Sequence, residues 1–208
     1  MEIKAARERM RRRGVPERVL ILDIEATGLQ ADSCPVEIAY GDPLESWVSA
    51  YLIKPHPGWK HFQLTERAQT LTGITPNMLS SATPADKVAK SVAEDLRRAD
   101  LVLSDSPAWD GRWLKKLLDL APSPVDVEVK DFFTTINAFN PLRKYLSTHK
   151  CLNIFDKSEH RAGGDVIRLL RVYRRAVPVP LWEEQYCPVK SRGFGMATRV
   201  PFIPGIPE

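Results

Sequence analysis

The sequence predicts an α/β domain built on a mixed five-stranded sheet with helices on its faces. Three short apolar segments come first, at 18–26, 35–40 and 45–53, and only a few residues separate them. Short links of this kind favour antiparallel pairing. Two later apolar segments, at 101–103 and 125–129, alternate with helical patterns. This alternation is typical of strands that are connected through helices lying on a sheet.

The helices are predicted from apolar residues at helical spacing and from capping residues. Thr83 is expected to cap a helix that runs to about Arg98, with Pro84 in its first turn. Other helical segments are expected at 2–13, 65–70, 109–120, 131–139 (helix or turn), 141–148 and 162–176. In the last helix we expect four arginines to face largely outward, namely Arg168, Arg171, Arg174 and Arg175.

The length of 208 residues and the hydrophobic content of 43% predict one domain with appendages. Residues 1–17 form a basic N-terminal arm, and residues 18–176 form the domain. Residues 177–208 carry six prolines together with several large apolar side chains. Because disordered segments are poorer in such side chains, this composition favours a strap lying on the domain or on a partner over a free tail.

Charge is unevenly distributed along the chain. Residues 1–18 carry a net charge of +4 and residues 143–175 carry +6, whereas residues 19–142 carry −6. This distribution suits an anionic polymer held near an acidic metal site, although a solvated surface of mixed charge is the alternative.

The three cysteines are odd in number and far apart, so they indicate neither a disulfide framework nor a metal-binding spacing. No apolar run approaches the roughly 20 residues that a membrane helix needs. A reducing, cytoplasmic setting is therefore expected, without a membrane partner.

Two carboxylates stand at the end of the first strand. The aliphatic run 19–22 leads directly into Asp23 and Glu25, which point to the same face because they are two residues apart. Like charges about 4 Å apart repel by roughly 4 kcal/mol at an effective dielectric near 20. A divalent cation such as Mg²⁺, which prefers carboxylate oxygen, would neutralise them. An edge strand whose acids face water is the alternative.

Two further acids follow in contexts that suit the same chemistry. Asp110 and Asp165 each lie near the start of a predicted helix, and His160 precedes Asp165 by five residues. Each acid also has a simpler interpretation as a first-turn residue favoured by the helix dipole. Asp105 competes with Asp110 for a functional role, and His160 taken alone is typical of an exposed loop.

In combination, these motifs resemble those of the DEDDh 3′–5′ exonucleases, the superfamily of polymerase proofreading subunits, ribonuclease T and oligoribonuclease. The matching motifs are Asp23-x-Glu25 followed by Thr27-Gly28-Leu29, Asp110 after an aromatic residue, His160-x-Ala162-x-x-Asp165, and the segment 71–75. The resemblance covers about residues 18–176 and implies a ribonuclease H-like fold. One departure is Ser106, at a position where the family usually has Asn.

The resemblance implies a centre that holds two divalent cations, Mg²⁺ or Mn²⁺. Asp23 would contact both ions, Glu25 and Asp165 would hold the ion that binds the attacking water, and Asp110 would serve the second through water. His160 would be the general base, and an imidazole with a reference pKa near 6.5 suits this role. The product would be a nucleoside 5′-monophosphate released from a nucleic-acid 3′ end.

The same resemblance implies the substrate contacts. The terminal nucleotide is expected against Ala26, Thr27, Gly28 and Leu29, with Gly28 free to adopt a positive φ. Ser106 belongs to this predicted binding set by its place in the middle motif, and Arg161 is expected to meet a phosphate. Aromatic stacking candidates are Trp59, Phe62 and Trp109, with burial in the core favoured for Trp109.

Other interpretations stay open at this point. One is a catalytically weak or inactive nucleic-acid-binding relative of the same fold, and another is an α/β phosphohydrolase that acts on a small nucleotide. DNA and RNA are not distinguished, because no motif reveals a pocket for the 2′-hydroxyl. A homodimer and a polymerase or repair partner are both compatible with the sequence.

Overall fold

The computed structural model describes residues 2–45, 47–60, 62–139, 160–177 and 190–192. Its strands are β1 (Val19–Ala26), β2 (Pro35–Gly41), β3 (Trp47–Lys54), β4 (Thr83–Pro84), β5 (Leu101–Ser104), β6 (Val129–Asp131) and β7 (Lys190–Arg192). Its helices are α1 (Glu2–Arg12), α2 (Glu66–Thr72), α3 (Pro76–Ser80), α4 (Ala85–Leu96), α5 (Pro107–Leu118), α6 (Phe132–Phe139) and α8 (Ala162–Ala176).

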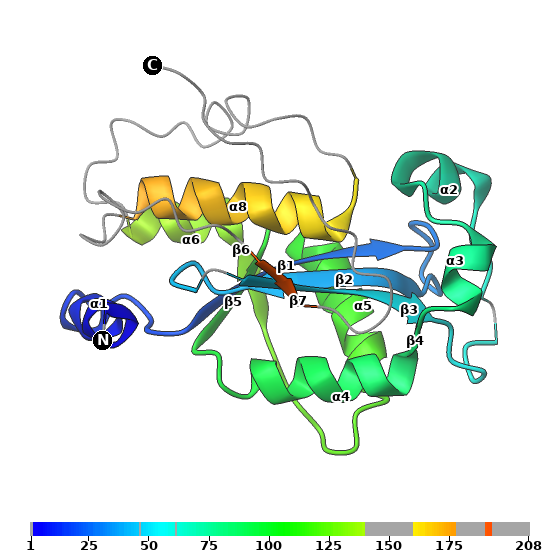
Figure 1. The fold of residues 1–208 in the computed structure, drawn as a ribbon, viewed down its shortest axis with the longest axis horizontal. Coiled ribbons are helices and arrows are strands. Elements are labelled where there is room, and N and C mark those ends of the chain that lie inside the picture. Colours follow the sequence, from blue (N-terminus) through cyan, green and yellow to red (C-terminus); the bar gives the residue numbers. More distant parts are fainter. Residues whose placement is uncertain (1, 46, 61, 140–159, 178–189, 193–208) are drawn as a thin grey trace.

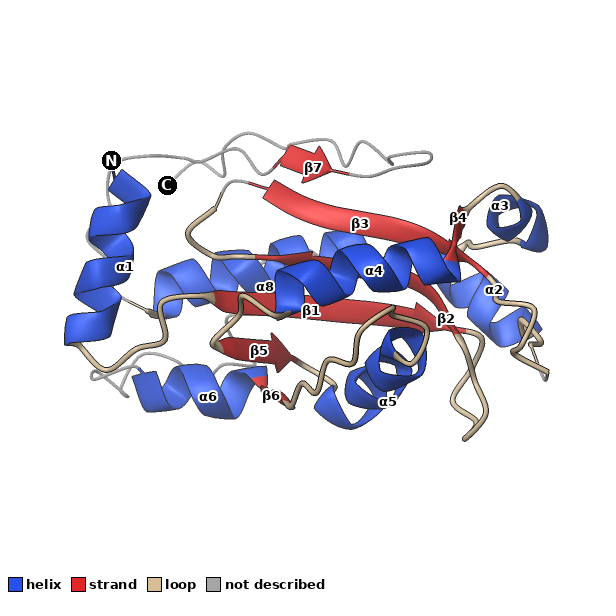
Figure 2. Ribbon diagram, turned by 90° about the horizontal axis from the view of Figure 1, so that it is seen from below, coloured by secondary structure: helices blue, strands red, loops and turns tan. Residues whose placement is uncertain are grey.

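The strands form one mixed sheet in the order β4-β3-β2-β1-β5-β6, and β7 pairs with β3. β1, β2 and β3 are antiparallel to one another, whereas β5 is parallel to β1 and β6 is parallel to β5. The predicted mixed α/β sheet with an antiparallel first part is confirmed. The short strands β4 and β7 add to the five predicted ones, and both lie beside β3 (Figure 2).

The residues of β1 alternate between two cores, one on each face of the sheet. Val19 and Ile21 pack into the core beneath α8 and α6, whereas Leu20 and Leu22 pack into the core beneath α4 and α5. Figure 1 shows α8 and α4 on opposite sides of the sheet. Since strand residues two apart share a face, Asp23 continues the row that faces α8.

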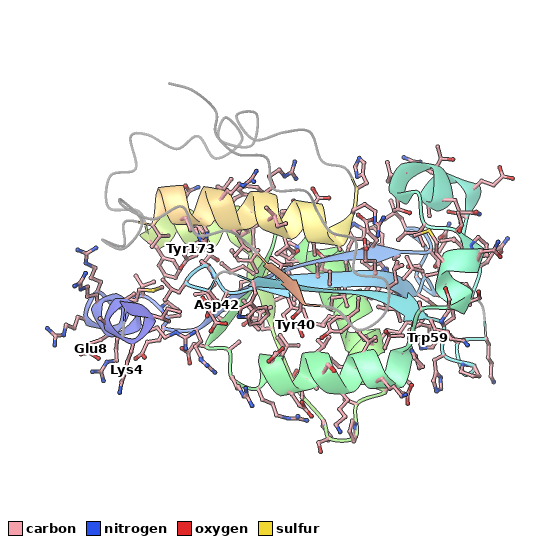
Figure 3. The ribbon with its side chains drawn as sticks, in the orientation of Figure 1. Lys4, Glu8, Tyr40, Asp42, Trp59 and Tyr173 are labelled. Carbon is pink, nitrogen blue, oxygen red and sulfur yellow. The ribbon has the colours of Figure 1, made fainter. Side chains whose placement is uncertain are left out.

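Helix α1 packs against one end of the domain. Ala6 and Met10 are buried in the same core as α8, and the Arg7 guanidinium pairs with Asp42 at 3.0 Å and with Glu45 at 2.8 Å. Lys4 projects away from this contact (Figure 3). The basic arm predicted at 1–17 therefore contains a helix that is part of the packed structure.

Several predicted boundaries were wrong. The helix expected from Thr83 begins at Ala85, because Thr83 and Pro84 pair with the end of β3. The helix expected from Trp109 begins at Pro107, and the strand expected at 125–129 lies at Val129–Asp131. The helix predicted at 141–148 and all of the strap beyond 177, apart from 190–192, lie outside the described residues.

Among the described residues, no helix has the length and apolarity to cross a membrane.

Candidate metal centre and active site

Three carboxylates meet where β1 ends and α8 begins. Asp23 and Glu25 come from β1, and Asp165 comes from the first turn of α8. One oxygen from each lies within 4.8 Å of the other two. Figure 1 shows the end of β1 and the start of α8 on the same side of the molecule. The alternation of β1 is the local cause, because it turns both strand acids toward α8.

A second group of carboxylates shares Asp23. Its other members are Asp105, between β5 and α5, and Asp110, in the first turn of α5, and their oxygens also lie within 4.8 Å of one another. Asp110 is only 1% exposed and accepts a short hydrogen bond from the Ser104 hydroxyl. The structure therefore brings together the four acids expected from the sequence and adds Asp105, which the sequence placed only in competition with Asp110.

Burial raises the pKa of four of these carboxyl groups, those of Asp23, Glu25, Asp105 and Asp110, and neighbouring negative charges raise it further. The pKa of Glu25 rises to about 8, mainly through burial and then through Asp165. The pKa of Asp110 rises to about 7, mainly through burial, with Asp105 adding to the effect. Burial and the charge of Asp110 place the pKa of Asp23 well above its usual range. Without a cation, the cluster therefore holds protons near neutral pH.

The donor set fits divalent cations. One carboxylate oxygen of Asp23, Oδ2, is buried and has no hydrogen-bond partner among the described residues. A buried, unsatisfied carboxylate oxygen is costly unless a cation or a donor satisfies it. Among the described residues, the ligand atoms of both acid groups are carboxylate oxygens, which Mg²⁺ and Mn²⁺ prefer. Asp23 belongs to both groups.

His160 precedes this centre along the chain. It is exposed, and its φ of 49° lies in the left-handed region that residues other than glycine seldom adopt. The next residue, Arg161, is the N-cap of α8. His160 therefore lies at the turn that leads into the helix carrying Asp165.

Arg161 binds a buried acid of the sheet. Its Nε and Nη2 donate to the two oxygens of Glu37 in β2, at 3.0 and 2.6 Å. The backbone N–H of Ala162 donates to Glu37 as well, at 3.0 Å. Sequence reasoning expected Arg161 at a phosphate and overlooked Glu37. An acid inside the apolar stretch 36–40 was the signal that could have found it.

Arg168 points into the acid cluster, so the prediction that it faces outward was wrong. Its side chain is 17% exposed, and its Nη2 lies 3.3 Å from Asp165 and 3.8 Å from Asp105. Arg168 follows Asp165 by three positions, so the two lie on the same side of α8. A cation of the protein thus lies beside the acids from both groups.

The predicted nucleotide-contact loop starts buried and then reaches the surface. Ala26 and Thr27 are buried, Gly28 is half-buried, and Leu29 is 59% exposed. Gly28 does not use its freedom to adopt a positive φ, since the described glycines with positive φ are Gly14 and Gly73. Leu29 is the member of this loop that offers an apolar side chain to a ligand.

Two neighbours hold this loop in place. The N–H of Thr27 donates to the carbonyl of Cys34, and the Thr27 hydroxyl accepts from the N–H of Cys34. The carbonyl of Thr27 accepts from the N–H and the hydroxyl of Thr65, the N-cap of α2. From the other side, the indole N–H of Trp113 in α5 donates to the Ser33 hydroxyl at 2.8 Å. The Lys116 ammonium donates to the carbonyl of Ser33 at 3.1 Å. Helix α5 therefore carries Asp110 and also fixes the loop after β1.

The remaining predicted contacts lie around α5 and the core. Ser106 is exposed at the N-cap of α5, and its N–H donates to Ser104 at 2.8 Å. Trp109 is half-buried and stacks on Trp113 with ring centroids 5.7 Å apart. Trp59 and Phe62 are also half-buried and pack against core clusters.

No protein-family model and no curated protein sequence matches the chain. Solved structures do match it. Exonuclease I of E. coli, in complex with a dT13 oligonucleotide, gives a TM-score of 0.57 at 15% identity, over 74% of this chain and 39% of that chain. A 3′-exonuclease that recognises the 3′ end of the histone mRNA stem-loop gives a TM-score of 0.54 at 18% identity, over 76% of this chain and 80% of that chain. Cell-death related nuclease 4 gives 0.52 at 18% identity, over 76% and 62%.

The chain has the fold of these exonucleases. The ribonuclease H-like fold expected from the sequence motifs is thereby confirmed. The chain spans about two fifths of the length of E. coli exonuclease I, at 39%. Because one fold can host many activities, the shared fold alone does not establish which reaction the acid cluster catalyses.

Proposed function

We propose that this chain is a metal-dependent 3′–5′ exonuclease acting on DNA or RNA whose 3′ end is single-stranded. The observation that carries the proposal is that two clusters of three acidic residues share Asp23 at the end of β1. Two acidic clusters with one residue in common suit two neighbouring divalent cations, the arrangement found in nucleases and polymerases.

The carboxylates have distinct roles in this proposal. Asp23 would hold both ions, Glu25 and Asp165 would hold one of them, and Asp110 would serve the other, with Asp105 beside it. When bound, the ions stabilise the entering and leaving oxygens of a phosphodiester displacement. Asp110 is buried and so is the Oδ2 atom of the half-buried Asp23, which keeps competing water away from these charges.

His160 is the general base of the proposed reaction. Its imidazole accepts a proton from the attacking water as the new P–O bond forms, and the bond from phosphorus to the 3′ oxygen breaks. The 3′ oxygen leaves as a hydroxyl on the shortened chain, and the released product is a nucleoside 5′-monophosphate. The exposure of His160 suits a base that must reach a bound chain end.

The substrate class is supported by the matched structures. One is E. coli exonuclease I in complex with a dT13 oligonucleotide, and another is a 3′-exonuclease that recognises the 3′ end of the histone mRNA stem-loop. Both ligands are nucleic acids, although one is DNA and the other RNA. The exposure of Leu29, four residues after Glu25 in the chain, supports its proposed contact with the terminal base.

A 5′-labelled oligonucleotide assay tests the proposal. Single-stranded DNA, single-stranded RNA and duplex with a recessed 3′ end are incubated with Mg²⁺, with Mn²⁺ and with EDTA. We expect products that shorten from the 3′ end with either metal, no products with EDTA, and a rate at least about 10³-fold lower for Asp23→Asn. The matched control is Asp86→Asn, on the exposed surface of α4, which keeps the wild-type rate.

Binding without cleavage would identify the chain as an inactive relative. Cleavage of free nucleotides alone would indicate a small-molecule phosphohydrolase. Full cleavage by Asp23→Asn would refute the metal centre.

A further inference from the structure

Glu37 is a buried acid in the interior of β2. It is 3% exposed, and both strand neighbours, Val36 and Ile38, are fully buried. A carboxylate in such a place is stable only when its oxygens are satisfied. Arg161 and the backbone N–H of Ala162 supply three hydrogen bonds, at 3.0, 2.6 and 3.0 Å. Within the part of the chain that the structure describes, the hydrogen-bond partners of this sheet carboxylate are thus Arg161 and Ala162, at the start of α8.

These bonds fix the start of α8 in two ways. The Ala162 N–H is one of the first-turn donors that a helix cannot satisfy internally, and Glu37 accepts from it in place of a capping side chain. A carboxylate at this end of a helix is also favoured by the helix dipole. The two-point contact with Arg161 sets the direction of the turn that leads into the helix.

The same contacts link α8 to the metal ligands of β1. Glu37 lies directly opposite Glu25 in the β1–β2 ladder. Side chains of residues paired across a ladder point to the same face. Glu25 therefore faces the acid cluster while its cross-strand neighbour holds the helix that carries Asp165 and follows His160.

We infer that Glu37 is a positioning residue of the exonuclease reaction, and this inference rests on the proposed function. Glu37 touches neither substrate nor ions. Acting through Arg161 and Ala162, it holds His160 and Asp165 in register with the carboxylates of β1. The role of Arg161 is then to bind Glu37.

The test compares Glu37→Gln with a matched control. Glu45→Gln makes the same change at a half-buried carboxylate that is also paired with an arginine, Arg7 of α1. For Glu37→Gln we expect kcat to fall by at least about tenfold, because small displacements of a catalytic group cost that much or more. KM for the oligonucleotide and the affinity for Mn²⁺ should each stay within about threefold. Glu45→Gln should keep the wild-type kcat.

Two further measurements separate positioning from a general loss of stability. Amide hydrogen exchange should show lost protection of the Ala162 N–H in Glu37→Gln and retained protection in Glu45→Gln. Arg161→Lys keeps a cation that can reach Glu37, so its kcat should lie between those of the wild type and Arg161→Met. If Glu37→Gln does not fold, this arginine pair carries the test.

The outcomes are distinct. Wild-type kcat in Glu37→Gln, or equal kcat in Arg161→Lys and Arg161→Met at the wild-type value, overturns the positioning role and leaves the exonuclease proposal standing. If kcat falls by the same factor in Glu37→Gln and in Glu45→Gln, the positioning role is also overturned. A wild-type chain that does not cleave oligonucleotides refutes the proposed function, and lost protection of the Ala162 N–H would then show a structural contact without a catalytic role.

Discussion

Arg168 shows how one residue can change the electrostatics of the acid cluster. Its guanidinium lies near both Asp105 and Asp165, which belong to the two different acid groups that share Asp23. In the metal-free protein it offsets part of the repulsion among these carboxylates. A bound divalent cation takes over that role, so the contribution of Arg168 to stability depends on metal.

Arg168→Met should therefore make the protein more dependent on metal. The metal-free variant should lose on the order of 1 kcal/mol of unfolding free energy, discounted for the partial exposure of the arginine. Thermal unfolding should show a larger rise in Tm on adding Mn²⁺ than in the wild type. Arg112→Met, which removes an exposed guanidinium over the Trp109 ring, is the control. Equal metal-induced shifts in Arg168→Met and wild type would contradict this role.

The raised pKa of Glu25 predicts a pH effect on stability. Its pKa is 4.5 ordinarily and about 8 in the folded protein. Between these values the folded state holds a proton that the unfolded chain releases, so stability falls as pH rises. The contribution of Glu25 is complete below its ordinary pKa and is lost by about pH 8.

Urea unfolding of metal-free wild type and Glu25→Gln at pH 5 to 8 measures this effect. The wild type should lose unfolding free energy relative to Glu25→Gln across the range. Saturating Mg²⁺ should remove the difference in slope, because the ion favours the ionised carboxylate. Parallel curves in the absence of metal would show that burial does not hold this proton.

At the scale of elements, three arginines in or next to α8 bind partners within the domain. Arg161 binds Glu37, Arg168 faces the acid cluster, and Arg174 donates to the carbonyls of Pro43 and Glu45. The sequence assigned this positive charge to an anionic partner. Periodicity predicted the helix at 162–176 correctly, but it could not reveal partners such as Glu37, which lies 124 residues before Arg161.

Helix α5 carries Asp110 and also donates hydrogen bonds to Ser33 in the loop after β1. Ser33→Ala tests this connection. The change leaves the buried indole N–H of Trp113 without its 2.8 Å acceptor. The free energy of unfolding should fall by about 2 kcal/mol, the cost of an unsatisfied buried donor. Ser80→Ala, at an exposed serine of α3, should change it by less than about 0.5 kcal/mol. Equal effects of the two substitutions in urea unfolding would argue against the connection.

At the scale of the whole molecule, segments that precede and follow the predicted domain in the sequence both contact it. Helix α1 covers one end, and β7 pairs with β3. The sequence separated both segments from the domain by composition, since arginines dominate one and prolines the other. The apolar pair Ala6 and Met10 is too short a pattern to predict docking, because its burial depends on a partner surface formed by distant residues.

Met10→Ala tests whether α1 belongs to the packed structure. Met10 is 3% exposed within the core shared with α8, so its truncation should cost about 2–3 kcal/mol of unfolding free energy. Arg9→Ala, on the exposed side of α1, should have little effect. Urea unfolding decides, and a Met10→Ala variant as stable as the wild type would show that α1 is a separate arm.

The central position of β1 has a consequence for how this chain tolerates change. β1 is hydrogen-bonded to β2 on one side and to β5 on the other, so neither Asp23 nor Glu25 can slide along the sheet. Exchanging one aliphatic residue of β1 for another keeps both carboxylates in phase. Inserting a single residue before Asp23 would turn both toward α4 and α5 and away from α8. Sequence drift in the core is therefore compatible with the site, whereas a change in strand length is not.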